Sequence, residues 1–361
     1  MELYIPTRLI LAENCIAQHM NEFTKFGKKA LIVTGKHSAK ASGALQDVTA
    51  ALDAVQIQYI IFDAIENNPG VETCFRGGEL AKREQADFVI AIGGGSPMDA
   101  AKAIAAYAAN DLEPMDLFAS DFAHTPLPLI CVPLTAGTGS EVTPYSVLTV
   151  KEIENKKSFS HTANFSKIAF LDPRYLKSLP RPVLLDTVAD ALSHAVESML
   201  CRRSTPASEV YAAAALSHIG AALPGILKGE PDYERLFLAS SLAGMAISHT
   251  GTVVVHSMGY LLTYYKGVPH GRANALLLPG FLQLCAQHVP DRLQPVLAAF
   301  GVSTTDMLID AVKSLTADTV QLSENDAAAY AAKAICAKNV PQVLWPLTES
   351  EEYTIYKSLV H

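Results

Sequence analysis

Four residues in the second half of the chain have the types and spacing of a divalent-metal site. Asp190 and His194 are four positions apart in a run of helix-forming residues, so an α-helix would place both side chains on one face. His256 lies in a second apolar, helix-like run, and His270 lies in a Pro-His-Gly turn. One carboxylate and three imidazoles suit Fe²⁺ or Zn²⁺ and leave room for a substrate oxygen. A lone histidine in an apolar helix is usually structural, so the hypothesis depends on all four together.

The elements that would position these residues fall into two groups. The chain has 361 residues, half of them hydrophobic, which is too long for one simple core and predicts two domains. In the first half, short apolar runs alternate with helix-like runs, a pattern typical of a parallel, doubly wound sheet. Strands are expected at residues 30–34, 58–62, 88–92, 127–132 and 168–171, with helices from about residue 71 and over residues 96–108.

After about residue 180 the pattern becomes helical, and no strand-like alternation of any length follows Asp172. Helices are expected at residues 183–202, 206–227, 231–248, 252–265, 272–289, 305–316 and 323–338. The predicted fold class is therefore an α/β N-terminal dinucleotide-binding domain (residues 1–176) followed by an all-α domain (residues 177–361). All four candidate metal ligands lie in the second domain.

Composition argues against several classes of partner. The formal net charge is −8 and no basic run stands out, which disfavours nucleic acid and an anionic membrane surface. No apolar stretch looks long and uncharged enough to span a bilayer, and the N-terminus lacks the regions of a signal peptide. The six cysteines are scattered and form no CxxC, which predicts reduced, mostly buried thiols and a cytoplasmic location.

A glycine-rich loop, Gly93–Gly95, follows one predicted strand and opens a helix. Glycines permit a tight turn and close approach of the backbone to an anion, and the free N–H groups of the helix start favour a pyrophosphate. Ser96 could cap the helix, Pro97 suits its first position, and Asp99 completes a capping-box-like spacing. The spacing is not GxGxxG, so a well-capped turn without a ligand remains an alternative, and Asp99 could cap the helix or contact a cofactor.

A second polar loop, Thr135–Thr143, also follows a strand. Its hydroxyls and amides suit ribose and phosphate oxygens, although a plain turn-rich loop would look similar. Both loops stand at the carboxyl ends of strands, where open α/β sheets bind ligands.

Four segments together resemble signature sequences of the iron-containing (group III) alcohol dehydrogenases, and most closely those of short members described as 1,3-propanediol dehydrogenases. The segments are Gly93–Asp99, Thr138–Thr143, Asp190–Glu197 and Pro269–Gly271, and their order and spacing match over nearly the whole chain. The resemblance implies a dehydroquinate synthase-like architecture, an active site in the cleft between the domains, and a homodimer. It also implies Fe²⁺ as the metal, with Zn²⁺ an acceptable substitute in an isolated preparation.

By motif position, the resemblance assigns individual roles. The metal ligands fall on Asp190, His194, His256 and His270, the pyrophosphate loop on Gly93–Ser96, the nicotinamide and ribose contacts on Asp99, Thr135 and Thr138, an adenosine-side contact on Asn68, and a ribose contact on Lys157. Many members carry a further histidine four residues after the third ligand, as a proton relay. This chain has Tyr260 there, and a phenol with a pKa of about 10 suits a pocket wall better than a relay.

The predicted activity is hydride transfer between NADP(H) and a short primary alcohol or diol, or its aldehyde. NADP(H) is preferred over NAD(H) because Gly35 follows the first strand where an Asp would hold the ribose 2′-OH. Lys36 and Ser38 could instead bind a 2′-phosphate. The alternative is that Gly35 only ends the strand and Lys36 is a solvated surface charge.

The substrate is expected to be uncharged. The helix with His256 is expected to place Met258, Leu261, Leu262 and Tyr260 near the metal, with little charge. Lys266 and Arg272 are the cations nearest in sequence to the predicted ligands. Three alternatives remain open at this stage: a dehydroquinate synthase-like lyase, a glycerol dehydrogenase-like enzyme on the same fold, and a non-catalytic nucleotide-binding protein.

Overall fold

The computed structural model describes residues 3–316 and 320–360. Residues 1–2, 317–319 and 361, which include the outer ends of both predicted domains, lie outside the described residues. The chain divides into two compact units. One is an α/β unit of Tyr4–Thr135 and Gly139–Leu179, and the other is a helical unit of Met1–Leu3, Ala136–Thr138 and Pro180–His361.

A six-stranded parallel sheet forms the centre of the α/β unit, with strand order β1-β8-β5-β4-β2-β3. The strands are β1 (Arg8–Leu11), β2 (Lys29–Thr34), β3 (Gln58–Phe62), β4 (Phe88–Gly93), β5 (Leu129–Pro133) and β8 (Ile168–Leu171). The five predicted strands are confirmed, and β1 was missed. This four-residue edge strand pairs along its whole length with β8, from Arg8 with Ile168 to Leu11 with Leu171.

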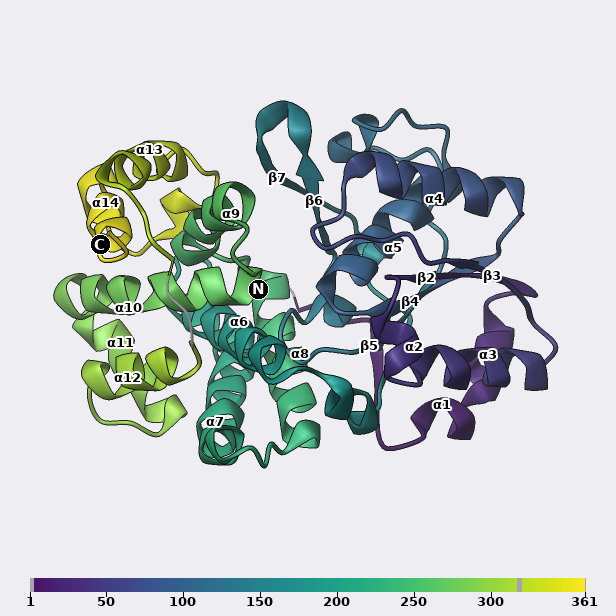
Figure 1. Cartoon of the computed structure of the whole chain (residues 1–361), viewed down its shortest axis with the longest axis horizontal. Coiled ribbons are helices and arrows are strands. Elements are labelled where there is room, and N and C mark those ends of the chain that lie inside the picture. Colours follow the sequence, from purple (N-terminus) through teal and green to yellow (C-terminus); the bar gives the residue numbers. More distant parts are fainter. Residues whose placement is uncertain (1–2, 317–319, 361) are drawn as a thin grey trace. The chain divides into compact units, whose positions relative to one another are not determined.

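Helices cover both faces of this sheet, as Figure 1 shows. The helices are α1 (Cys15–Gln18), α2 (Ser38–Ala41), α3 (Ala44–Ala54), α4 (Val71–Arg83) and α5 (Gly95–Ala109), and the 3₁₀ turns are η1 (Met20–Lys25), η2 (Asp116–Ala119), η3 (Ser140–Val142), η4 (Lys151–Ile153), η5 (Thr162–Asn164) and η6 (Pro173–Ser178). Alternate strand residues such as Ile32 and Ile90 join one buried cluster with Leu52 of α3. Their neighbours Leu31 and Val89 point to the opposite face and are also fully buried. Burial on both faces explains why these strands are continuously apolar.

A two-stranded antiparallel hairpin, β6 (Tyr145–Val150) and β7 (Asn155–Ser160), was not predicted. Asp99 of α5 binds the first strand of this hairpin through both its side chain and its backbone. The carboxylate of Asp99 accepts a hydrogen bond from the backbone N–H of Val147 (3.0 Å), and the backbone carbonyl of Asp99 accepts one from the Ser146 hydroxyl (2.7 Å).

The second unit is helical throughout its described part, which contains isolated β-bridges but no strand, as predicted. Its elements are α6 (Arg181–Met199), α7 (Pro206–Lys228), α8 (Tyr233–Thr250), α9 (Val254–Lys266), α10 (His270–His288), α11 (Pro290–Phe300), α12 (Thr305–Ser314), α13 (Glu324–Ala334), η7 (Val340–Gln342) and α14 (Glu349–Lys357). The sequence missed α11 and α14. Pro290, which ended the preceding predicted helix, occupies the first turn of α11, where proline is well tolerated.

Helix α7 corrects one expectation from composition. Its 23 residues have a mean hydropathy of 1.5 over an 18-residue window, so it is long and apolar enough to cross a membrane by length and composition alone. Two bent helix pairs, α8 with α9 and α11 with α12, pass the same test together. In α7 the hydropathy comes mostly from valine, leucine and isoleucine, with a smaller share from alanines. The helix packs against α6, α8 and α11.

Helix α6 is the most enclosed element of the helical unit. Every residue from Val188 to Leu200 is buried, and the helix packs against α7, α8 and α10. An apolar helix buried all round is ordinary in a large core. Buried carboxylates and imidazoles on such a helix are not ordinary, because a charge away from water needs a partner.

Candidate active site

The candidate metal ligands come from three helices of the helical unit. Asp190 and His194 lie one turn apart on α6 and are 2% and 5% exposed. His256 is in the first turn of α9, which begins after Gly251 ends α8, and it is 2% exposed. His270 is the first residue of α10, and its side chain is 25% exposed. The structure brings all four side chains together.

One oxygen is the centre of this cluster. Asp190 Oδ1 lies 3.8 Å from Nε2 of His194, 3.5 Å from Nε2 of His256 and 3.7 Å from Nε2 of His270. In a tetrahedral site with bonds of about 2.1 Å, two ligand atoms are separated by about 3.4 Å. The ligand atoms of Asp190, His194 and His256 all lie within 4.8 Å of one another, so these three form a buried Asp/His/His metal site.

The protonation states of Asp190 and His194 suit metal binding, whereas His256 must release a proton to bind an ion. Burial alone would raise the pKa of Asp190, but His194, His270 and a hydrogen bond with His256 outweigh it and hold the pKa far below its usual value. Burial lowers the pKa of His194 to about 4, so this imidazole is neutral near pH 7 and has a lone pair to offer. Burial acts the same way on His256, but the carboxylates of Glu197 and Asp190 raise its pKa to about 9.

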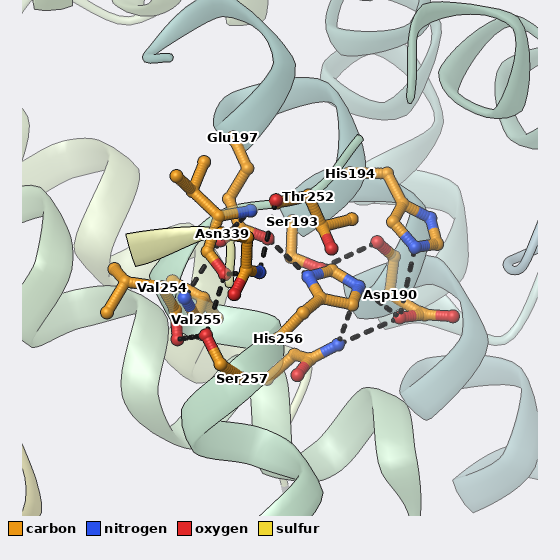
Figure 2. Close-up of polar contacts among 12 residues, drawn as sticks. Asp190, Ser193, His194, Glu197, Thr252, Val254, Val255, His256, Ser257 and Asn339 are labelled. Carbon is orange, nitrogen blue, oxygen red and sulfur yellow. Dashed lines mark hydrogen bonds and ion pairs between the residues drawn. The ribbon is translucent and has the colours of Figure 1, made fainter. Parts of the chain in front are cut away.

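The outer nitrogens of two imidazoles are held by acceptors. Nδ1 of His194 lies 3.3 Å from the carbonyl oxygen of Gly137, and Nδ1 of His256 contacts Glu197. In Figure 2 the His256 ring lies between Glu197 on one side and Asp190 on the other. Acceptors behind the ring are what metal-binding histidines commonly have, because they orient the ring and fix its tautomer.

The start of α10 is clamped onto α6. Arg272 donates to Asp186 through Nε (3.0 Å) and Nη2 (3.2 Å). Gly271 packs so closely that a Cβ there would lie 1.9 Å from the carbonyl oxygen of Asp186 and 3.1 Å from Cβ of Asp190. A side chain at position 271 would therefore push His270 away from Asp190.

Asn274 was missed from the sequence. This fully buried side chain donates through Nδ2 to Asp190 Oδ1 (3.0 Å) and to Nε2 of His256 (3.1 Å), and it lies 3.4 Å from Nε2 of His270. Its signal was available, because Asn274 is four residues after His270 on the same helix, the spacing that paired Asp190 with His194.

Tyr260 stacks on His270, with ring centroids 5.4 Å apart and an angle of 22° between the planes. This places its ring beside the metal-site cluster. The expectation that Met258, Leu261 and Leu262 also line the site needs correction. They lie on the side of α9 away from His256 and are buried in the core, and the carbonyl oxygen of Met258 accepts a hydrogen bond from Tyr356.

The predicted nucleotide loops meet at one edge of the sheet in the α/β unit. β2 lies between β3 and β4, so the strand order reverses direction there, and ligands of open α/β sheets bind at such reversals. Gly35 follows β2, the Gly93–Gly95 turn follows β4, and Thr135 follows β5. Lys36 and Ser38 are exposed next to Gly35. Thr138, in contrast, belongs to the helical unit.

The turn after β4 has the features of an anion cradle. A Cβ on Gly94 would lie 3.0 Å from Oγ1 of Thr135, so the missing side chain keeps this space open. Oγ1 of Thr135 is buried and has no hydrogen-bond partner among the described residues. A buried hydroxyl of this kind beside the first N–H groups of a helix fits a phosphate or ribose oxygen.

The capping prediction for this turn is wrong. Helix α5 begins at Gly95 with Gly94 as the N-cap and no side-chain cap. Ser96 accepts a hydrogen bond from the backbone N–H of Asn68 instead (3.2 Å). Asp99 accepts hydrogen bonds from the hydroxyl of Ser140 in η3 (2.6 Å) and from the backbone of β6, so its carboxylate serves these two segments and not the start of α5.

Two neighbouring lysines on β7 take different positions. Lys156 donates to Oδ1 of Asn68 (2.7 Å), and Asn68 lies next to Ser96. The Nζ atom of Lys157 lies 4.6 Å from the ring centroid of Phe118. Successive strand residues point to opposite faces, so Lys156, and not Lys157, lies beside Asn68. The ribose contact expected of Lys157 stays a prediction.

Comparison with known proteins extends this picture. A family model described as iron-containing alcohol dehydrogenase matches residues 6–173, and one described as Fe-containing alcohol dehydrogenase family, C-terminal, matches residues 184–355. The lactaldehyde reductase of Escherichia coli (strain K12) is 30% identical over 298 residues, covering 81% of this chain and 78% of that protein. The 1,3-propanediol dehydrogenase of Citrobacter freundii is 32% identical over 308 residues, covering 81% and 79%. The crystal structure of an iron-containing alcohol dehydrogenase from Thermotoga maritima has a TM-score of 0.92 and is 37% identical, with 99% of both chains covered.

These matches agree with the motifs read from the sequence and with the two-part fold. They decide against the lyase and the non-catalytic alternatives. The chain belongs to the iron-containing alcohol dehydrogenase family and is an NAD(P)-dependent oxidoreductase with a buried Asp/His/His metal site.

Proposed function

We propose that this enzyme transfers a hydride between NADP(H) and a short, uncharged primary alcohol or diol, or the corresponding aldehyde. The observation that carries the proposal is the meeting of one carboxylate and three imidazoles around a single oxygen of Asp190. Fe²⁺ is the metal expected from the family, with His270 as the fourth ligand beside Asp190, His194 and His256.

The donor set suits such an ion. When bound, the metal supplies Lewis-acid polarisation of the substrate oxygen. The chain's own part is to hold the ligands: the charge of Asp190 balances the cation, and His194 is neutral at physiological pH. The buried ligand atoms also limit water around the reacting centre.

Cations near the metal site are already paired, which supports an uncharged substrate. Arg272 is engaged by Asp186, and Lys266 donates to Asp326 (2.9 Å). A phosphorylated or carboxylated substrate would need cations that can turn to it. The wall formed by Tyr260 offers an aromatic surface instead.

Proton transfer differs in this proposal from that of relatives with a further histidine. Tyr260 stands at that position, with its ring stacked on His270. A phenol is a weak base near neutral pH, so water accepts the alcohol proton and Tyr260 only shapes the pocket.

The proposed preference for NADP(H) depends on the segment after β2. Gly35 carries no acid, and Lys36, His37 and Ser38 are exposed beside it. Asp63, which follows β3, forms an ion pair with Lys40 (3.3 Å), so its charge is offset locally. A 2′-phosphate would lie over Gly35–Ser38, and Asn68 and Lys156 would take the adenosine and ribose side.

Steady-state kinetics with both cofactors and a panel of short aldehydes test the proposal. We expect a higher kcat/KM with NADPH, activity lost with a chelator and restored by Fe²⁺, and little turnover of phosphorylated or carboxylated aldehydes. Gly35→Asp should weaken NADPH binding by about 1.5–3 kcal/mol, the contribution of one charge-assisted contact, and leave NADH binding unchanged. The new Cβ would lie 3.3 Å from the carbonyl oxygen of Ile65, so it needs only a small adjustment. An equal or higher kcat/KM with NADH would refute the preference for NADP(H) and leave the dehydrogenase assignment standing.

A homodimer and a cytoplasmic location complete the proposal. The homodimer comes from the family resemblance, and the location comes from the scattered cysteines, none of which forms a CxxC pair. Light scattering of the metal-loaded protein at micromolar concentration measures the first, and fractionation of the native host measures the second.

A further inference from the structure

Glu197 is a buried carboxylate of α6 that the metal chemistry does not use directly. It is 0% exposed. Asp190, His194 and Glu197 are spaced by four and three residues, so they lie along one face of the helix. A buried carboxylate is costly unless it is fully hydrogen-bonded, so its partners reveal what it does.

The two carboxylate oxygens of Glu197 have different partners. Oε1 accepts hydrogen bonds from the backbone N–H groups of Val253 (3.0 Å) and Val255 (2.8 Å), at the start of α9. α9 has no side-chain cap of its own, so Glu197 caps it from another helix. Oε2 contacts Nδ1 of His256, as Figure 2 shows.

The contacts of Nε2, on the opposite side of the His256 ring, indicate which nitrogen carries the proton. Nε2 faces Nδ2 of Asn274 at 3.1 Å and Oδ1 of Asp190 at 3.5 Å. An amide NH₂ can only donate, so the neutral ring accepts at Nε2 and carries its proton on Nδ1, toward Glu197. The partners on both sides of the ring therefore select the same tautomer.

We propose that Glu197 is a positioning residue that fixes His256 as the Nδ1–H tautomer and aims its Nε2 lone pair at the metal position. Through its second oxygen it ties this imidazole to the α6 helix that carries Asp190 and His194. Glu197 acts through His256 and contacts neither metal nor substrate. The inference depends on the metal site and is independent of the proposed cofactor and substrate.

A purely structural role would be capping of α9, and Glu197→Gln separates the two roles. The amide oxygen of Gln can still accept from Val253 and Val255. Its NH₂ group then faces Nδ1 of His256, which must become an acceptor and move the proton to Nε2. The cap is kept and the tautomer is reversed.

The test measures metal affinity and stability side by side. Zn²⁺ affinity is obtained by competition with a chromophoric chelator, and stability by urea unfolding of the metal-free protein. We expect Glu197→Gln to bind Zn²⁺ roughly 10–100-fold more weakly, the range for losing such a supporting contact, with a near-normal unfolding transition. Glu352→Gln is the matched control, because Glu352 is also a fully buried glutamate of the helical unit but lies on α14. It should leave Zn²⁺ affinity unchanged.

A spectroscopic measurement on the wild type keeps the proposal falsifiable if the variant fails to fold. In zinc-loaded protein labelled with ¹⁵N-histidine, long-range ¹H–¹⁵N spectra identify the protonated nitrogen of each ring, and His256→Asn assigns the signal. We expect a proton on Nδ1 of His256 and the metal on Nε2. Metal bound through Nδ1, or Zn²⁺ affinity of Glu197→Gln within two-fold of wild type, would overturn the proposal.

Discussion

Replacing Gly271 by Ala should open the metal site without touching a ligand. The new Cβ would lie 1.9 Å from the carbonyl oxygen of Asp186 and 2.7 Å from its carbonyl carbon. The nearest acceptable C···O separation is about 3.3 Å, so the start of α10 must retreat by roughly 1.4 Å. His270 is the preceding residue and moves with it.

That retreat exceeds what a metal site accepts. Ligand distances must hold within roughly 0.2 Å, so the His270 bond would be lost or badly strained. We expect Zn²⁺ or Fe²⁺ affinity to fall at least about ten-fold, with turnover falling in parallel. Overpacking should also cost about 1–3 kcal/mol of unfolding free energy.

Chelator competition and urea unfolding measure the two effects, and Gly267→Ala is the control. Gly267 ends α9 with φ of +67° and has no atom within 4 Å of an added Cβ. The substitution should destabilise the fold by about 1 kcal/mol through backbone strain and leave metal binding intact. If Gly271→Ala bound metal as tightly as wild type, the close packing of α10 on α6 would not set the site's geometry.

Three further results are expected. Burial raises the pKa of Glu352 to about 8 from an ordinary 4.5, so the folded protein keeps a proton that the unfolded chain loses. Wild-type stability should therefore fall by up to about 5 kcal/mol as pH rises between these values, and Glu352→Gln should remove that slope in urea titrations at pH 5 to 9. Lys156→Ala should raise the KM for the dinucleotide about ten-fold, whereas Lys157→Ala should not, and equal effects would contradict their placement on opposite faces of β7. Lys102 is a fully buried lysine of α5 whose Nζ lies 3.7 Å from the carboxylate of Asp99. Lys102→Met should cost about 3 kcal/mol in urea unfolding because it leaves the partly buried Asp99 without its cation, and an unchanged midpoint would refute this pairing.

Short-range patterns predicted the pairing of Asp190 with His194 and the central strands of the sheet. The i, i+4 spacing of Asp190 and His194 needs only a helix, and α6 is one. Long apolar runs predicted the buried central strands, since such runs are rare outside the interior of a parallel sheet. His256 and His270 were grouped with Asp190 and His194 from residue type, and the grouping needed the family motifs as support, because the path of the chain between helices is not readable from local spacing.

The contacts that the sequence did not predict are those in which a side chain binds a partner far along the chain and not a neighbour in sequence. Ser96 and Asp99 have the spacing of a cap, yet both bind segments far along the chain. Lys156 and Lys157 are identical in type, and only the pleat of β7 separates their roles. The contact of Glu197 with the start of α9 requires knowing how two helices cross. Long-range packing decides these contacts, and propensity does not.

The ligands come from three helices, and 84 positions separate Asp190 from Asn274, which contacts it. An ion that joins these helices closes a long loop, a constraint that favours the folded chain. With free metal at 100 times its Kd, the native state gains about 2.7 kcal/mol. In a metal-starved cell the starts of α9 and α10 would open more often, and proteases would remove the chain sooner. The abundance of this enzyme, and not only its activity, would then follow the supply of its metal.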